Sequence, residues 1–230
     1  MNKPIYVPSG KAKEYGDYAL NIYTGCPHHC WYCYAPSVLH IDRKSFHTDV
    51  RPRDGIVEAV EKQLAKGGIK DKLIHLCFAC DPYPRGHDTT VTREIIQLIK
   101  GSGNHVQILT KGAGLRDIDL LDENDWYGVS ITGEEPDLAI AMLMKGVVLA
   151  KKSAIKTWCS YEPVLNPAVI LRRLYYWSVI FDKVKIGKLN HHPSTIDWKA
   201  FGEEAERLCI ELGLDYYIKD SLRAEMEKQP

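Results

Sequence analysis

Six short runs of β-branched and other apolar residues alternate with segments of helical periodicity along this sequence. The runs cover residues 19–24, 73–80, 105–110, 127–132, 156–162 and 179–187. Strands that alternate with helices predict a parallel sheet whose strands are joined by right-handed crossovers. Six such units occupy the 230 residues, whereas a complete eight-unit barrel typically needs about 250. We therefore expect an α/β fold of the partial (β/α)6 TIM-like barrel type, with residues 214–220 as a candidate seventh strand.

The segments between the runs carry helix signals at their ends and along one face. Asp54 suits the cap of a helix that ends at Gly67 and Gly68. Asn166 and Pro167 suit the cap and first position of a helix over 166–177. Residues 92–101 and 194–213 also have helical spacing. The apolar positions expected to be buried are Ile56, Val57, Val60 and Leu64 in the first helix and Trp198, Phe201, Ala205, Leu208 and Leu212 in the last. We expect one domain over 1–230, with about residues 1–18 as a short extension.

Composition excludes some classes of protein and leaves others open. Thirty basic and thirty acidic residues cancel, so the whole chain has no net attraction for a polyanion, although a local basic face remains open. The N-terminal stretch "MNKPIYVPSG" has no apolar signal-peptide region, and no apolar run reaches membrane-spanning length. We expect a cytoplasmic protein that does not enter a membrane. In that setting seven cysteines, three of them clustered, indicate metal binding rather than disulfides.

Cys26, Cys30 and Cys33 follow the first predicted strand with the spacing C-x3-C-x2-C. Active sites of barrel folds lie at the C-terminal ends of the strands. Three thiolates hold three corners of a metal centre and leave a fourth position open for a ligand. A [4Fe–4S] cluster with one free iron fits this pattern best. The alternative is a zinc site completed by His28, His29 or His40, although we expect His28 and His29 to be exposed loop residues.

The motif resembles that of the radical S-adenosylmethionine (SAM) superfamily, in which C-x3-C-x-(aromatic)-C follows the first strand of a six-unit partial barrel. The resemblance extends over the whole chain. It implies a [4Fe–4S] cluster on Cys26, Cys30 and Cys33, with the amino and carboxylate groups of SAM on the fourth iron. Tyr32 matches the aromatic residue beside the adenine.

Further strand ends resemble the spore photoproduct lyase branch of that superfamily. In "LTKG", Lys111 matches a lysine that holds the SAM carboxylate, and in "VSIT", Ser130 matches a serine on the SAM ribose. A solvated loop lysine and a strand hydroxyl with internal partners are the alternatives. In "FACDPYP", Cys80 matches a cysteine that returns a hydrogen atom to the product, and Asp81 follows it in the expected cofactor site. Buried cysteine is otherwise a small apolar residue.

Cys77 and Glu162 also lie at or near predicted strand ends. We expect Cys77 and Cys80 to lie on one strand and point to opposite faces, which disfavours a joint metal site. Glu162 in "YEPV" is a candidate site residue that binds a polar group of cofactor or substrate, or a neighbouring arginine.

The resemblance implies an enzyme that accepts an electron from a donor such as flavodoxin or ferredoxin, cleaves SAM reductively, and uses a 5′-deoxyadenosyl radical to abstract hydrogen from its substrate. Nucleic acid or a nucleotide is the expected substrate. A peptide or small metabolite, and a non-catalytic zinc-stabilised binding module, are the alternatives. This chain differs from the lyases in two features. It is shorter, and its net charge is zero, whereas binding to DNA phosphates needs basic residues. Here only local segments, 11–13, 41–47 and 50–53, offer such a patch.

Overall fold

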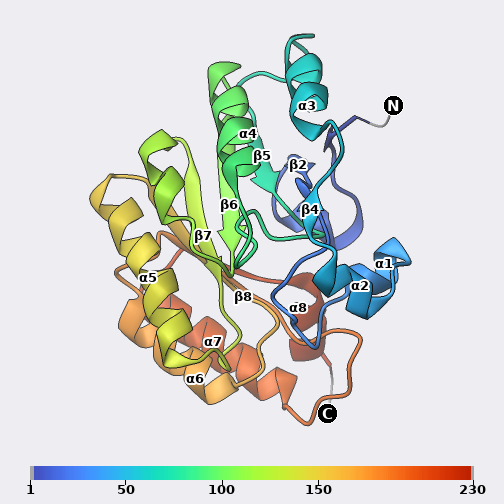
Figure 1. The fold of residues 1–230 in the computed structure, drawn as a ribbon. Coiled ribbons are helices and arrows are strands. Elements are labelled where there is room, and N and C mark those ends of the chain that lie inside the picture. Colours follow the sequence, from blue (N-terminus) through green and yellow to red (C-terminus); the bar gives the residue numbers. More distant parts are fainter. Residues whose placement is uncertain (1–2, 229–230) are drawn as a thin grey trace.

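A curved eight-stranded sheet with helices on its outer face forms the centre of the molecule (Figure 1). The computed structural model describes residues 3–228. The strand order is β1-β2-β5-β6-β7-β8-β9-β10, and every neighbouring pair is parallel except β1 with β2. The predicted partial barrel is confirmed. The candidate seventh strand, predicted over 214–220, is present as β10 (Tyr216–Ile218).

The strands of this sheet are short and follow the predicted runs. They are β1 (Ile5–Tyr6), β2 (Tyr18–Leu20), β5 (Leu73–Leu76), β6 (His105–Thr110), β7 (Trp126–Ser130), β8 (Lys156–Tyr161), β9 (Lys183–Ile186) and β10 (Tyr216–Ile218); β3 (Tyr23–Thr24) and β4 (Arg51–Pro52) form a separate antiparallel pair. The helices are α1 (Ala35–Leu39), α2 (Arg43–Thr48), α3 (Ile56–Leu64), α4 (Thr90–Gly101), α5 (Asp137–Lys152), α6 (Pro167–Trp177), α7 (Trp198–Glu211) and α8 (Asp220–Met226), with 3-10 turns η1 (Gly10–Glu14) and η2 (Leu115–Leu120).

Two predicted strands end earlier than expected. The run 19–24 divides into β2 and β3, because Asn21 turns its side chain toward the backbone of the next strand end. Its Oδ1 accepts hydrogen bonds from the N–H groups of Phe78 (2.8 Å) and Ala79 (2.9 Å). The run 73–80 stops at Leu76, and Cys77 adopts a left-handed conformation with φ +71°. Residues 77–80 therefore form a turn at the mouth of the barrel instead of strand.

The segment before the first predicted strand is ordered against the barrel. β1 pairs with β2, and Gln63 on α3 exchanges two hydrogen bonds with the backbone of Ile5, at 2.9 and 2.7 Å. After η1 the ring of Tyr15 enters the barrel, where its centroid lies 5.4 Å from that of His75 and 6.0 Å from that of Trp158. This segment closes the end of the barrel at which the strands begin.

The helix signals in the sequence predict the positions of the helices mostly correctly. The observed starts of two helices differ from the predicted ones. Asn166 caps α6 through Val169 N at 3.3 Å, as predicted. The residue before α3 is Gly55 with φ +63°, while Asp54 instead pairs with Arg51 at 3.0 Å. Helix α7 begins at Trp198 behind its cap Asp197, later than predicted. The predicted core positions of these helices are buried except Val57, Leu208 and Leu212, which are partly exposed.

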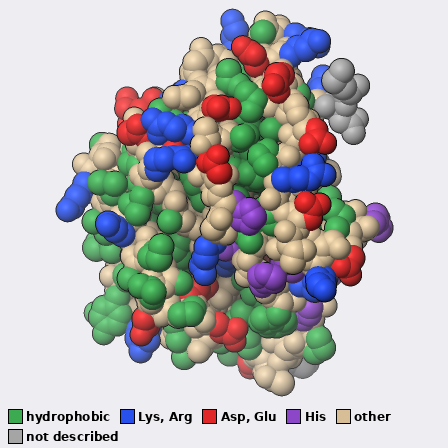
Figure 2. All heavy atoms as spheres, in the orientation of Figure 1, with side chains coloured by type: hydrophobic (Ala, Val, Ile, Leu, Met, Phe, Trp, Pro, Cys, Tyr) green, Lys and Arg blue, Asp and Glu red, His purple; other side chains and the backbone are tan. Residues whose placement is uncertain are grey.

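Helix α5 was not assigned from the sequence, and its outer face is apolar. Leu138, Met142 and Leu149 are exposed there, and hydrophobic side chains gather over α5 and α6 in Figure 2. Within residues 3–228, every helix is too short or too polar to cross a bilayer.

Candidate active site

The loop that carries the three cysteines, residues 25–34 (the cluster-binding loop), is fastened to α2. Gly25 has φ +75°, and a Cβ atom there would lie 2.5 Å from the carbonyl oxygen of Phe46 and 2.8 Å from that of Asp49. Only glycine fits this close approach. The N–H of Cys26 donates to Phe46 O at 3.0 Å, and His47 Nδ1 lies 2.7 Å from Cys26 O.

Arg43 fixes the other two cysteines through their backbone. Its guanidinium donates to Cys30 O at 3.1 Å and to Cys33 O at 2.8 Å. The N–H of Cys33 also donates to Cys30 O at 3.0 Å. Protein groups therefore satisfy all three cysteine carbonyls, which leaves the thiols as the free ligating groups of the loop.

The surroundings of the thiols fit a cationic metal cluster. Burial raises the pKa of Cys26 and Cys33, so a thiolate at either position needs a positive partner. The N–H groups of His28 and Ala35 offset part of that cost by donating to the sulfurs of Cys26 and Cys33. N–H groups directed at ligating sulfurs are one of the ways in which a protein tunes an iron–sulfur cluster.

The three thiols are spaced more widely than the ligands of a single zinc ion. At a Zn–S distance of about 2.3 Å, ligating sulfurs lie within about 4.6 Å of one another. Among residues 3–228, one group of three potential ligands has all its ligand atoms within 4.8 Å of one another, namely His105, Asp122 and Asp125. The three cysteine sulfurs do not all lie that close together. The wider spacing of the cysteines favours a multi-iron group.

The three histidines considered as zinc ligands divide into one with a buried side chain and two exposed residues. His29 is exposed with its ring 4.7 Å from that of His47, and His40 ends α1 in an exposed left-handed conformation. Histidine side chains are visible on this face of the molecule in Figure 2. The expectation that His28 is an exposed loop residue is wrong: its side chain is only 5% exposed, and Nε2 lies 3.3 Å from Asp81 Oδ2. The loop turns this imidazole inward toward the strand ends.

Asp81 is buried and its carboxylate is occupied by protein groups. Oδ1 accepts hydrogen bonds from Thr110 Oγ1 (2.6 Å) and Tyr83 N (2.8 Å), and Oδ2 accepts one from Lys111 N (2.8 Å). Burial alone would raise the pKa of Asp81, but His28 and the donors from Lys111 and Thr110 outweigh it and lower the pKa. Direct contact of Asp81 with SAM stays a prediction, while its observed contacts organise the turn after β6.

Lys111, Tyr32 and Ser130 come together at the ends of neighbouring elements. The ammonium of Lys111 lies over the Tyr32 ring, 5.8 Å from its centroid, and donates to Ser130 O at 3.3 Å. The Ser130 hydroxyl is buried and donates to Glu162 O at 3.4 Å. A cation, an aromatic face and a hydroxyl beside the cluster-binding loop can bind a carboxylate, a base and a ribose. Their assignment to these parts of SAM stays a prediction.

Glu162 has partners that sequence reasoning missed. Its Oε2 accepts a hydrogen bond from Tyr15 Oη at 2.5 Å and lies 2.7 Å from Lys219 Nζ. No arginine pairs with it among the described residues. Lys219 follows β10, so its place at a strand end was a usable signal, whereas nothing in the sequence around Tyr15 indicated that it enters the barrel.

A second carboxylate near Lys111 was also missed. Glu135 accepts hydrogen bonds from Thr132 Oγ1 (2.7 Å), Gly133 N (3.1 Å) and Arg173 (2.9 Å). Burial raises its pKa, but the Thr132 donors and the charge of Lys111 outweigh this and lower it. Glu135 therefore adds negative charge to the surroundings of Lys111.

Cys77 and Cys80 do not point to opposite faces of a strand, because β5 ends before both of them. Their thiols contact each other, and both lie against the backbone amides of residues 22–23. Burial raises the pKa of Cys77, which is 6% exposed, whereas Cys80 is partly exposed. Whether Cys80 donates hydrogen to a product stays a prediction.

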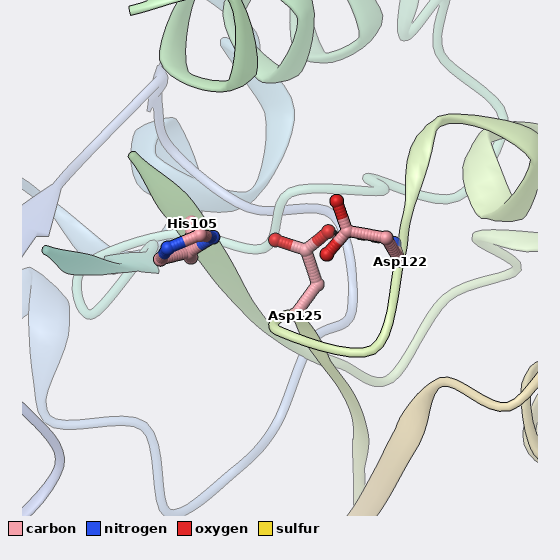
Figure 3. Close-up of side chains that lie close together, drawn as sticks. All are labelled: His105, Asp122 and Asp125. Carbon is pink, nitrogen blue, oxygen red and sulfur yellow. Dashed lines mark hydrogen bonds between the residues drawn. The ribbon is translucent and has the colours of Figure 1, made fainter. Parts of the chain in front are cut away.

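The compact group His105, Asp122 and Asp125 lies away from this site, at the end of the barrel where β6 and β7 begin (Figure 3). Its two carboxylates already hold a cation of the protein, because Lys100 Nζ lies 2.5 Å from an oxygen of each. Asp125 also accepts hydrogen bonds from Val106 N and Asp122 N, both at 2.8 Å. The group is a structural charge network.

Comparison with known proteins identifies the class of this enzyme. A model of the Radical SAM superfamily matches residues 20–172, more than half of the chain, and the chain belongs to this superfamily. Uncharacterized proteins of Mycobacterium bovis and Mycobacterium tuberculosis are 31% identical to it over 123 residues. That match covers 51% of this chain and only 36% of each relative, so the chain spans well under half of the curated proteins it matches.

Solved structures of radical SAM enzymes share the fold at low sequence identity. Spore photoproduct lyase complexed with dinucleoside spore photoproduct superposes with a TM-score of 0.66 and 12% identity, over 93% of this chain and 79% of that one. Streptococcus suis SuiB bound to the precursor peptide SuiA gives 0.64 and 12%, over 90% and 50%. Another lyase structure contains bound AdoMet.

Enzymes of this superfamily use a [4Fe–4S] cluster and SAM and need a reductant. When bound, the cluster supplies the electron that cleaves SAM to methionine and a 5′-deoxyadenosyl radical. In this chain, Cys26, Cys30 and Cys33 would hold it. The turn after β6 brings the side chain of Lys111 to the end of β7, where Ser130 is the last strand residue.

Proposed function

We propose that this enzyme abstracts hydrogen from a nucleic acid or nucleotide. The observation that carries the proposal is the position of two exposed aromatic residues within the cluster-binding loop. Trp31 is 51% exposed and Tyr34 48% exposed, next to Cys30 and Cys33 respectively. Exposed aromatic faces stack on unpaired bases and are the usual means of holding single strands.

Basic side chains adjoin these aromatics on α2 and β4. Arg43, Lys44 and Arg51 are exposed there, and the Arg43 guanidinium is bound to the loop itself. Arg51 is partly neutralised by Asp49 and Asp54. Lysine and arginine on such a face neutralise phosphates, which is why binding to a polyanion weakens as salt rises. This local basic face can attract phosphate groups even though the chain as a whole has no net charge.

The expected basic patch is smaller than the sequence suggested. Lys11 and Lys13 belong to η1, and Lys13 lines a cavity of about 330 Å³ together with Lys183 and Lys185. That cavity lies where the barrel strands begin, away from the cluster-binding loop. Lys11 instead donates to Asn190 Oδ1 at 3.1 Å. Asn190 is two residues before His192, whose ring centroid lies 5.2 Å from that of Trp31. Segments 41–47 and 50–53, together with Lys11, are therefore the parts of the expected patch that are left for contact with a substrate.

The lyase complexed with dinucleoside spore photoproduct motivates this substrate class, and SuiB bound to the precursor peptide SuiA, which has nearly the same TM-score, motivates the peptide alternative. In this proposal Cys80 returns a hydrogen atom to the substrate radical. A thiol is suited to that step because its S–H bond is weaker than the C–H bond it forms.

Binding of a fluorescent thymine-rich single strand tests the substrate class directly. Trp31→Ala should weaken binding by about 1–3 kcal/mol, the usual value for one stacked base. Lys44→Ala should lower the salt dependence of binding. Tyr175→Ala is the matched control, since Tyr175 is 58% exposed on α6 and carries no part of the proposed face.

Hydrogen transfer gives the second test. Deuterated thymine-containing oligonucleotides, dinucleotides and, separately, deuterated peptide pools are incubated anaerobically with reconstituted enzyme, SAM and a reductant, and deuterium is sought in 5′-deoxyadenosine. Deuterium from the oligonucleotide supports the proposal. Equal binding by wild type and Trp31→Ala, or deuterium transfer only from peptide pools, overturns it.

A further inference from the structure

Asp81 lies between two parts of the site that come from distant segments of the chain. On one side its carboxylate holds the end of β6, through the hydroxyl of Thr110 and the N–H of Lys111. On the other side it faces His28, which stands between Cys26 and Cys30 in the cluster-binding loop. One buried carboxylate therefore contacts both the cluster-binding loop and the strand end that presents Lys111.

The His28 side of this contact is closed to solvent. The imidazole is 5% exposed and the Asp81 side chain 8%, and the atoms that face each other are 3.3 Å apart. Nε2 of His28 is buried, and no hydrogen bond in residues 3–228 satisfies it. A buried polar atom without a partner is costly, and Asp81 Oδ2, 3.3 Å away, is an acceptor that a small shift of the ring would bring into hydrogen-bond geometry.

The Asp81 side is rigid because two turns interlock. Tyr83 N donates to Asp81 Oδ1, and a Cβ atom on Gly112 would lie only 2.0 Å from Tyr83 O. Gly112 N in turn donates to Thr110 Oγ1 at 2.7 Å. The turn after β5 and the turn after β6 therefore move together, and any displacement of Asp81 displaces the backbone of Lys111.

We propose that Asp81 and His28 form a positioning link that sets the cluster-binding loop at a fixed distance from the Lys111 strand end. In this role both residues act through their neighbours and not on the reacting atoms. Their function is to keep the metal ligands and the SAM-binding cation in register, as outer-shell partners of metal ligands do. The link rests on membership of the superfamily and is independent of which substrate the enzyme uses.

Three variants of one residue test the link. His28→Gln keeps an N–H donor near the position of Nε2, His28→Asn keeps an amide that is too short to reach Asp81, and His28→Leu removes the donor. Each is reconstituted anaerobically, iron and sulfide are measured, and the SAM dissociation constant is determined by equilibrium dialysis. The electron paramagnetic resonance spectrum of the reduced cluster is recorded with and without SAM.

We expect His28→Leu and His28→Asn to bind SAM about 10-fold to 100-fold more weakly, the range typical of outer-shell losses, and to lose most of the spectral change that SAM causes. His28→Gln should keep both properties. His29→Leu is the control, because this neighbouring histidine is exposed and lies against His47 instead of Asp81. The proposal is overturned if the three His28 variants and His29→Leu all bind SAM equally well. It is also overturned if His28→Gln loses SAM affinity as His28→Leu does.

A double-mutant cycle separates one link from two independent roles. Asp81→Asn should weaken SAM binding at least as much as His28→Leu, because it also disturbs Thr110 and Lys111. If the residues act through each other, adding His28→Leu to Asp81→Asn causes no further loss. Additive losses would mean that His28 acts on the cluster alone, and the positioning link would be wrong.

Discussion

Lys219 bridges two carboxylates across the barrel, with its ammonium 2.7 Å from Glu162 Oε2 and 3.0 Å from Glu14 Oε2. Lys219 is 4% exposed, and Glu162 and Glu14 have side chains 19% and 8% exposed. The bridge ties the ends of β8 and β10 to the segment that precedes β2.

Removal of this ammonium should destabilise the protein strongly. Lys219→Met leaves two largely buried carboxylates without their cation, which typically costs about 3–5 kcal/mol of unfolding free energy. Urea unfolding of wild type and variant at neutral pH measures the loss. Lys228→Met is the control, because its pair with Glu225 is on the surface and should contribute about 0–1 kcal/mol. Similar losses in the two variants would contradict the prediction.

Lys185 should make the stability of the folded state rise with pH in the alkaline range. Burial, together with the positive charges of Lys219 and Lys183, lowers the pKa of Lys185 from 10.5 to about 8. Between these values the unfolded chain holds a proton that the folded protein has released, so stability increases with pH. The free energy of unfolding of wild type minus that of Lys185→Met should rise from pH 8 toward pH 10.5, by about 3 kcal/mol at most.

That difference cancels the titration of cysteines and tyrosines, which both proteins share. Urea unfolding at a series of pH values gives it directly. Lys156→Met, a change of the same kind at an exposed lysine, should give a flat difference. A flat difference for Lys185→Met as well would refute the depressed pKa.

The stability of the protein should depend on Lys100, which is the cation paired with the two carboxylates shown in Figure 3. Asp125 is fully buried, and Lys100→Met would leave its charge without a cation, at a cost of about 3–5 kcal/mol. Since Lys100 occupies the space between the carboxylates, millimolar Mn²⁺ should not raise the melting temperature of the wild-type protein. Thermal unfolding with and without the ion checks both statements. Asp71→Asn, which affects only the 93% exposed partner of His105, should have little effect.

Gly112 should tolerate no side chain. A Cβ atom at this position would lie 2.0 Å from Tyr83 O, so Gly112→Ala must displace the turn after β6. Overpacking of this kind typically costs about 1–3 kcal/mol, and SAM binding should weaken because Lys111 is the adjacent residue. Gly101→Ala is the matched control, since a Cβ atom there has no neighbour within 4 Å. Unfolding and SAM dialysis on both variants provide the measurement, and equal behaviour would count against the interlocked turns.

The cluster and the SAM site should be separable by mutation. Cys30→Ala should lose most of its iron and acid-labile sulfide, about four of each in the wild-type protein. Lys111→Ala and Ser130→Ala should keep the cluster and bind SAM more weakly, because they remove a cation and a hydroxyl from the other side of the site. Stoichiometric zinc without sulfide, or unchanged SAM affinity in both strand-end variants, would refute these assignments.

The sequence by itself determined the architecture of this protein and marked its candidate metal ligands. The strand and helix periods are local, so the parallel order, the position of α6 behind Asn166 and the three cysteines after the first strand could be read directly. The cluster motif is local too, since all three ligands lie within eight residues. The placement of Lys111 and Ser130 at strand ends followed from the same alternation.

Only the tertiary structure decided which side chains meet across the barrel. His28 and Asp81 are 53 positions apart, yet they face each other because the cluster-binding loop folds inward over the turn after β5. Cys77 and Cys80 share one pocket because that strand ends at Leu76, where a left-handed residue breaks its alternation. Contacts of this kind depend on loop conformation and on packing between distant segments, and a periodic pattern along the chain contains neither.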